Sequence, residues 1–250
     1  MHLRPAPVVA RVATATGVYR PGAATLRREV AVGLHLAAAG APAVAPSREL
    51  PPGPHSRGGL VLSFWEHLEV VAPEPDARAA GAALRELHEA LATFPAAQLE
   101  PFARPLEASR MVPMLTIDEA DAAMLAHATK SSLAAVAELG LPLQPLHGDA
   151  HLRNVLTTAA GPLWIDLEDT FFGPVGWDLA CLVTLGREFG GEAGPGEAAL
   201  EEHGGALPDE LVRLRAVQIV VWTVAMADRI PSLRERAESS LRWARERFGP

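Results

Sequence analysis

Residues 143–156 read LQPLHGDAHLRNVL and set two histidines, an aspartate, an arginine and an asparagine between two apolar flanks. A packed core gains nothing from such a cluster, because a buried polar group costs free energy unless it finds a hydrogen-bond partner. The stretch is therefore either a solvated loop, in which Asp149 and Asn154 cap turns, or a place where chemistry occurs. The residues that come after it favour chemistry.

These following residues predict a β-hairpin. Residues 155–157 and 163–166 read as two short strands joined by the turn TAAGP. A hairpin brings its two ends together, so Asp149 and Asn154, on the loop that enters it, are expected to meet Asp166 at its far end. One carboxylate can then accept a hydroxyl proton, while an amide oxygen and a second carboxylate hold Mg²⁺, which shares such ligands with phosphates. These are the parts of a phosphoryl-transfer site.

The motif HGDAHLRN, followed by WIDLED, resembles the catalytic loop and metal-binding segment of the aminoglycoside phosphotransferase and choline kinase family. The spacing from Asp149 to Asn154 equals that in the protein-kinase pattern H-R-D-x-x-x-x-N, and IDLED stands where those kinases have D-F-G. The resemblance implies an α+β, two-lobed, protein-kinase-like fold. It also implies that Asp149 is catalytic and that Asn154 and Asp166 hold the metal.

The small lobe carries the rest of the expected nucleotide site. VVARV resembles the family's strand with the phosphate-contacting basic residue, and Arg11 stands where lysine is usual. LRREVAVGLHL resembles the helix whose acid, here Glu29, pairs with that residue; a surface ion pair is the alternative. LVLSFWEHLEV fits the strand and hinge that frame adenine, which places Phe64 and Trp65 at the nucleotide. Lys130, the only lysine, lies in a predicted large-lobe helix and cannot take the role of Arg11.

Two further residues are expected to support the site. GPVGWDLACLV resembles the helix after the metal segment, whose aspartate, here Asp178, holds the catalytic-loop backbone. His147 is expected to bond backbone and order the loop without touching substrate. Glu168 is open between a second metal contact and an acid at the hairpin exit. The family begins with a strand pair and a nucleotide-covering turn, yet only seven residues precede Val8, so the small lobe is expected to lack that pair.

Apolar periodicity elsewhere predicts a small strand-containing lobe and a larger helical one. We place the boundary so that residues 1–68 form the nucleotide-binding lobe and residues 69–250 the catalytic and acceptor-binding lobe. Thr116 and Glu119 predict a capping box at the start of one helix. The predicted strands outside the hairpin are 8–14, 43–45 and 60–64, and the predicted helices are 24–40, 75–94, 116–139, 176–186, 207–230 and 231–248.

Composition indicates which cellular compartment and which classes of partner to expect. A formal net charge of -8 and a pI near 5.6 argue against nucleic acid, whose binding relies on clustered Lys and Arg. Cys181 is the only cysteine and stands in an apolar setting, which predicts a buried structural thiol and a reducing compartment. The N-terminus lacks a signal-peptide pattern, and the longest apolar segment, 216–227, is too short to span a bilayer. We expect a cytoplasmic protein that binds no membrane.

The sequence therefore predicts an Mg²⁺-dependent kinase that moves the γ-phosphoryl group of ATP or GTP to a hydroxyl of a small molecule. The acceptor, the choice of donor and the oligomeric state stay open. One alternative is a catalytically weak or silent nucleotide-binding module of the same fold. Another is a metal-dependent hydrolase, since His147, Asp149 and His151 spell H-x-D-x-H, and histidine with carboxylate is what zinc and iron sites use.

Overall fold

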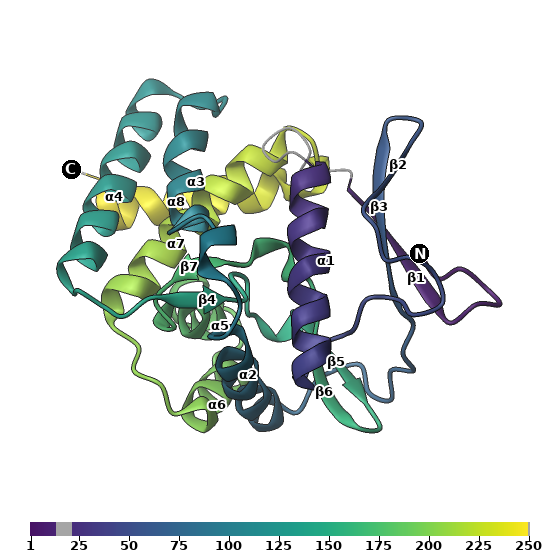
Figure 1. Ribbon diagram of the computed structural model, residues 1–250. Helices are drawn as coiled ribbons and strands as arrows, with labels where there is room; N and C mark the ends of the chain where they lie inside the picture. Colours follow the sequence, from purple (N-terminus) through teal and green to yellow (C-terminus); the bar gives the residue numbers. More distant parts are fainter. Residues whose placement is uncertain (14–21, 250) are drawn as a thin grey trace.

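The computed structural model describes residues 1–13 and 22–249, which form a small lobe with a sheet and a larger helical lobe (Figure 1). The small-lobe sheet has the strand order β1-β3-β2 and is antiparallel throughout. Its strands are β1 (Val8–Ala13), β2 (His55–Arg57) and β3 (Leu60–Glu66). The prediction of strands at 8–14 and 60–64 is confirmed within the described residues, and position 14 lies outside them.

Helix α1 (Gly22–Ala39) runs beside this sheet (Figure 1). Its buried face includes Leu26 and Val30, and Gly33 lets it approach β3, because a Cβ there would lie 2.9 Å from the ring of Trp65. Chain residues ahead of β1 also pair with it: the Met1 amino group donates to the Ala10 carbonyl at 2.8 Å. The predicted strand at 43–45 is only an isolated bridge from Ala43 to Trp164.

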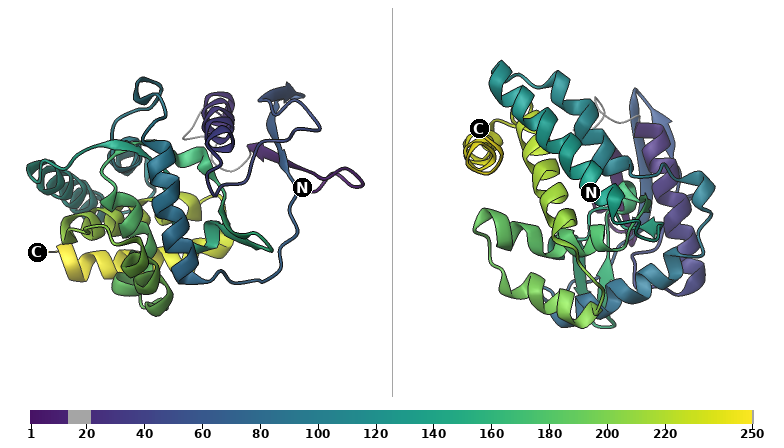
Figure 2. Two further views of the ribbon diagram at one scale, coloured as in Figure 1. Left: turned by 60° about the horizontal axis from the view of Figure 1, so that its bottom comes forward. Right: turned by 90° about the vertical axis from the view of Figure 1, so that its left-hand side faces the viewer.

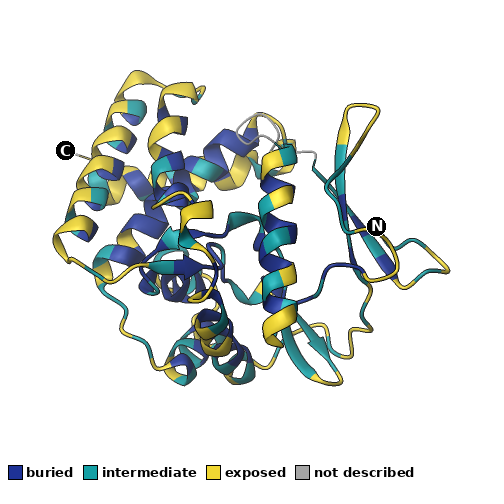
Figure 3. Cartoon of the chain, in the orientation of Figure 1, coloured by how far each residue is buried: buried dark blue, intermediate teal, exposed yellow. Residues whose placement is uncertain are grey.

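The large lobe is built from helices, and α5 and α7 are its most buried members (Figure 3). The helices are α2 (Ala77–Leu91), α3 (Ala103–Met111), α4 (Glu119–Glu138), α5 (Gly176–Phe189), α6 (Gly194–His203), α7 (Asp209–Ala227) and α8 (Arg234–Phe248). Short 3-10 turns are η1 (Ala96–Gln98), η2 (Val112–Met114), η3 (Leu152–Asn154), η4 (Leu167–Asp169) and η5 (Pro231–Leu233). The C-terminal helix α8 lies on the side of the lobe away from the small-lobe sheet (Figure 2).

Two short pairs of strands shape the region between the lobes. The predicted hairpin is present as β5 (Val155–Thr158) and β6 (Gly161–Trp164), although β6 ends two residues before Asp166. Strands β4 (Gln144–Leu146) and β7 (Phe171–Gly173) pair antiparallel and were not predicted. Their pairing brings the segment after β4 against the segment before β7, and these two segments carry the polar motifs.

The helices differ from prediction at two of their starts. The capping box of Thr116 and Glu119 is wrong: α4 begins at Glu119, and its N-cap is Asp118, whose carboxylate accepts the Asp121 amide at 2.8 Å. Aspartate is at least as good a cap as threonine, and it stands one residue before the helix. The helix predicted from residue 231 is a 3-10 turn followed by α8. No helix in the described part of the chain has the length and apolar character needed to cross a membrane.

Candidate active site

The loop between β4 and η3 carries Asp149 at the junction of the lobes. Its side chain is 25% exposed, so the carboxylate can be reached from outside. Oδ1 accepts a hydrogen bond from Nη2 of Arg215 on α7, and Oδ2 lies 3.4 Å from Nε2 of His151. Burial by itself raises the pKa of Asp149, but Arg215, His151 and His147 outweigh burial and hold this pKa well below its usual range. Asp149 is therefore a carboxylate in the folded protein.

Asp178, fully buried on α5, binds the backbone of this loop. Its Oδ2 accepts the N–H of His147 and its Oδ1 accepts the N–H of Gly148, both at 2.8 Å. Nε2 of His88 on α2 lies 2.9 Å from the same Oδ2, and Nδ1 of His88 lies 3.0 Å from Nε2 of His203 on α6. Through Asp178, helices α2 and α6 are thus linked to the loop that carries Asp149.

Gly148 is required by the shape of the loop. Its φ is +90°, and an added Cβ would lie 2.0 Å from the carbonyl oxygen of Asp169, so no side chain fits there. Its own carbonyl accepts the indole N–H of Trp177 at 2.8 Å. Glycine at this position lets the catalytic loop touch η4.

His147 is buried and has both ring nitrogens in use. Nε2 donates to the Ile165 carbonyl at 2.8 Å, and Nδ1 accepts the Asp149 amide at 3.3 Å. The ring also stands edge-on to Trp164. Because neither nitrogen of His147 is free, His147 is not available as a ligand for the zinc or iron site of the hydrolase alternative. Among the described residues, no three His, Cys, Asp or Glu side chains form a metal-binding group.

Asn154 and Asp166 lie on the two segments that β4 and β7 bring together. Nδ2 of Asn154 donates to the Asp149 carbonyl at 2.9 Å, which leaves its Oδ1 for another partner. Asp166 has a left-handed φ of +67°, unusual for a residue with a side chain. Carboxylate oxygens of Asp166 and Glu168 both lie 2.6 Å from one atom, Nη2 of Arg11. The Ile165 N–H donates to the Asn154 carbonyl at 2.9 Å, so Asn154 and Asp166 come from paired segments of the chain. Two carboxylates that share one cationic centre are the kind of group that holds a Mg²⁺ ion which also takes phosphate oxygens.

Arg11 connects the lobes at this point. While Nη2 meets the two large-lobe carboxylates, Nη1 lies 3.0 Å from Oε1 of the buried Glu29 on α1. Burial raises the pKa of Glu29 to about 8 despite Arg11, and repulsion from Glu168 and Asp166 adds to this rise. Burial alone lowers the pKa of Arg11, but the three acids outweigh it and raise that pKa. One guanidinium thus serves three carboxylates, one from the small lobe and two from the large lobe.

A cavity of about 290 Å³ lies beside Arg11, between the sheet and the hairpin. Its wall is mostly apolar and includes Trp65, the ion-paired Arg11, Glu29 and Asp166 form a charged end, and Glu66 also lines it. Phe64 does not line it, because successive side chains on a strand face opposite ways, and its ring packs 5.2 Å from that of His55.

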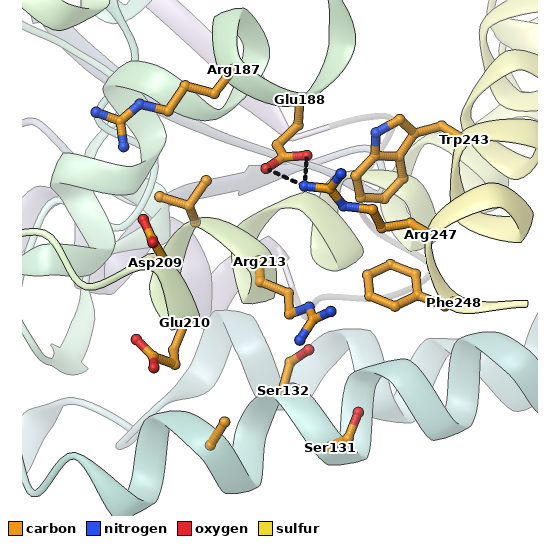
Figure 4. A pocket seen from close by; sticks show the side chains of 12 residues that line it. Ser131, Ser132, Arg187, Glu188, Asp209, Glu210, Arg213, Trp243, Arg247 and Phe248 are labelled. Atoms are coloured by element: carbon orange, nitrogen blue, oxygen red, sulfur yellow. Dashed lines mark hydrogen bonds and ion pairs between the residues drawn. The ribbon is translucent and has the colours of Figure 1, made fainter.

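Another cavity, of about 450 Å³, lies elsewhere, among α4, α5, α7 and α8 (Figure 4). None of the predicted site residues lines it. Its arginines are already engaged: Arg247 pairs with Glu188 at 3.2 Å, and Arg213 lies 5.5 Å from the ring centre of Phe248. The catalytic loop is on the other face of α7, so we assign the chemistry to the smaller cavity between the lobes.

Sequence reasoning missed Arg215 and His88. Both are polar residues on otherwise buried helix faces, and each contacts a residue of the motifs: Arg215 contacts Asp149, and His88 contacts Asp178. The available signal for Arg215 was an arginine directly before the longest apolar segment, 216–227. Cys181 is buried, as predicted, and burial raises the pKa of its thiol. Lys130 is exposed on α4, in the helix where it was predicted.

Known proteins share this fold. The model of the phosphotransferase enzyme family matches residues 6–216. The fold is similar to a choline/ethanolamine kinase family protein from Mesorhizobium loti, with 20% identity, a TM-score of 0.61, and coverage of 97% of this chain and 88% of that chain. It is also similar to the amicoumacin kinase hAmiN in complex with AMP-PNP, Ca²⁺ and Ami, with 13% identity, a TM-score of 0.65, and coverage of 94% and 80%.

A third similar structure is the aminoglycoside phosphotransferase APH(3'')-Id from Streptomyces rimosus in complex with ADP and streptomycin, with 18% identity, a TM-score of 0.58, and 86% coverage of both chains. No curated protein matches the chain. At these identities the solved structures establish the fold, and the predicted two-lobed, kinase-like α+β class is confirmed. The family model covers the chain from before β1 to within α7, so the chain belongs to the phosphotransferase enzyme family and is a small-molecule kinase.

Proposed function

We propose that this kinase transfers the γ-phosphoryl group of ATP or GTP to a hydroxyl group of a small molecule, with Mg²⁺ bound at Asn154 and Asp166. The observation that carries the proposal is the meeting of Arg11 from the small lobe with Asp166 and Glu168 from the large lobe. The guanidinium of Arg11 faces the carboxylates of Asp166 and Glu168, which would hold the metal. The phosphates of the nucleotide would lie between the guanidinium and the metal.

The nucleotide would lie in the cavity between the lobes. Its apolar wall, with Trp65, suits a flat base, and its charged end suits phosphates. Arg11 would contact the phosphate oxygens, and Glu29 would hold the guanidinium in place through Nη1. In this proposal residues 1–68 supply the nucleotide-binding lobe, and residues 69–250 supply the catalytic loop and the acceptor site.

The metal would be held by the Oδ1 of Asn154 and the carboxylate of Asp166, and Glu168 is near enough to be a further ligand. When bound, Mg²⁺ neutralises charge on the phosphate oxygens. Asn154 is kept in place by its hydrogen bond to the Asp149 carbonyl, so the metal ligand and the catalytic residue are fixed by the same loop.

Asp149 would receive the hydrogen bond of the acceptor hydroxyl and aim its oxygen at the γ-phosphorus. Its pKa lies well below the usual range, so it is ionised and ready to accept that bond at neutral pH. Positioning of this kind accounts for most of the catalysis expected in phosphoryl transfer.

A coupled ADP- or GDP-release screen tests the proposal. Purified protein is incubated with Mg²⁺ and either ATP or GTP, against a panel of aminoglycosides, amino alcohols such as choline and ethanolamine, and sugars. These classes include those named for the similar structures. At least one alcohol should raise diphosphate release above the rate without acceptor. Tight Mg-nucleotide binding with no release for any alcohol would instead support the silent nucleotide-binding module.

A further inference from the structure

Helix α7 carries a buried guanidinium into the catalytic loop. Arg215 is 7% exposed, and its Nη2 donates to Oδ1 of Asp149. Its Nη1 donates to Oε1 of Gln218, one turn further along the same helix, at 2.7 Å. Its guanidinium lies 5.6 Å from the ring centre of Trp177, whose indole N–H in turn holds the Gly148 carbonyl. Arg215 is therefore fixed on several sides before it meets Asp149.

This contact makes the two oxygens of the catalytic carboxylate different. Oδ1 of Asp149 is occupied by Arg215, whereas Oδ2 lies only within a long contact, 3.4 Å, of His151. A carboxylate held by one fixed ion pair cannot turn freely about its χ2 bond. Oδ2 has the weaker contact and is therefore the oxygen better placed to meet an incoming group.

We propose that Arg215 is a positioning residue for phosphoryl transfer: it fixes the Asp149 carboxylate through Oδ1 and leaves Oδ2, beside His151, to receive the acceptor hydroxyl. This inference rests on the proposed function. In the transfer, the acceptor oxygen bonds to the γ-phosphorus as the bond to the bridging oxygen breaks. The nucleoside diphosphate leaves with that electron pair, and the hydroxyl proton passes along its bond to Oδ2 and on to solvent.

Several charged or titratable groups lie at or beside the Asp149 carboxylate. Arg215 comes from α7, His147 and His151 come from the catalytic loop, and Asp169 comes from η4. The nearby groups on α5 are Cys181 and Asp178. Arg215 is the one among them that both bonds the Asp149 carboxylate and carries a permanent positive charge.

The test uses Arg215→Met and Arg215→Lys, with Arg213→Met as the matched control. Arg213 stands two residues earlier on α7, is exposed, and lies in the cavity away from the catalytic loop (Figure 4). Two readouts are needed. One is diphosphate release with the best alcohol of the screen, or with water as acceptor. The other is the pH titration of the Asp149 carboxyl carbon by ¹³C NMR, with its signal assigned from Asp149→Asn.

Arg215→Met should lower kcat by about 10- to 100-fold, the effect of losing orientation, while the Kd for Mg-nucleotide changes little. The Asp149 titration should move up by about one pH unit or more, because the opposite charge is gone. Arg215→Lys should restore most of the titration but only part of kcat, since a point charge replaces a planar fork. Arg213→Met should behave as the wild type.

The inference is overturned if Arg215→Met keeps the wild-type kcat and the wild-type Asp149 titration. If Arg215→Met does not fold, Arg215→Lys decides: wild-type kcat in that variant contradicts a positioning role. A wild-type protein that binds no Mg-nucleotide and releases no diphosphate contradicts the proposed function itself. An active wild type with an equally active Arg215 variant contradicts only this inference.

Discussion

Removal of the Asp178 carboxylate should both destabilise the protein and disable the site. The side chain is fully buried and accepts the backbone N–H groups of His147 and Gly148 at 2.8 Å each, and Nε2 of His88 lies 2.9 Å away. Asp178→Ala would leave these three polar groups buried without this partner. Among the described residues, the acceptor that these two loop amides use is Asp178.

The magnitude follows from counting these groups. A buried donor left without a partner costs about 1 to 3 kcal/mol, so three of them cost about 3 to 9 kcal/mol before the structure relaxes or water enters. Relaxation reduces this figure, and we expect a loss of about 3 to 5 kcal/mol. For a chain of this size, 1 kcal/mol corresponds to roughly 2 to 4 °C, so the melting temperature should fall by about 6 to 20 °C.

Thermal unfolding followed by circular dichroism measures this loss, and diphosphate release measures the site. The matched control is Asp228→Ala, an exposed aspartate at the end of α7, which should melt within about 2 °C of the wild type because surface substitutions cost little. Asp178→Asn should fall between the two, since an amide can accept only one of the two N–H groups. A melting temperature for Asp178→Ala close to that of the control, with full activity, would refute the reasoning.

Three further predictions follow from the site. Gly148→Ala should abolish turnover, because the added Cβ would lie 2.0 Å from the Asp169 carbonyl oxygen. Gly161→Ala, also at positive φ but with no atom within 4 Å of the added Cβ, should cost only backbone strain and keep activity. Equal activity of the two variants in diphosphate release would contradict this prediction. Burial, with His88 and Arg85, lowers the pKa of His203 to about 4, below its value in the unfolded chain, so the neutral form stabilises the fold above about pH 6.5. Urea unfolding should show that about 1 to 3 kcal/mol of stability is lost as the pH falls toward 4. A His203→Gln variant with the same pH dependence of stability would count against this prediction. Arg11→Ala should weaken Mg-nucleotide binding by about tenfold or more and Arg11→Lys much less, because lysine keeps the charge; calorimetry that finds both variants unaffected would remove Arg11 from the site.

Much of the fold could be predicted because its signals are local. The turn TAAGP between two short apolar runs predicted β5 and β6, and the leucine spacing before residue 94 predicted α2. The missed elements are short or depend on distant partners. Strands β4 and β7 are three residues each and pair across the span from Gln144 to Gly173, so neither has a pattern of its own. Helix α6 carries a proline in its first turn amid many glycines, which reads as a loop.

The site residues also fall into those that a local sequence pattern predicts and those that depend on contacts between distant segments. The spacing from Asp149 to Asn154 and the acid at Asp166 are written in one continuous stretch, so the sequence alone named them as candidates. The contact of Arg215 with Asp149 joins residues far apart in the chain, and only the packing of α7 against the loop creates it. The placement of Phe64 and Trp65 at the nucleotide stays a prediction. Strand alternation lets only one of two neighbouring side chains face the cavity, and Trp65 is the one that lines it.

The central claim is that one carboxylate positions the acceptor while another holds the metal with the nucleotide. Isothermal titration calorimetry of Mg-ATP and Mg-GTP with Asp149→Asn and Asp166→Ala, paired with diphosphate release, tests it most directly. Asp149→Asn should bind nucleotide about as tightly as the wild type while its turnover falls by about 100-fold or more, and Asp166→Ala should lose metal-dependent binding. Equal loss of nucleotide binding in both variants, or full turnover in Asp149→Asn, would contradict the account.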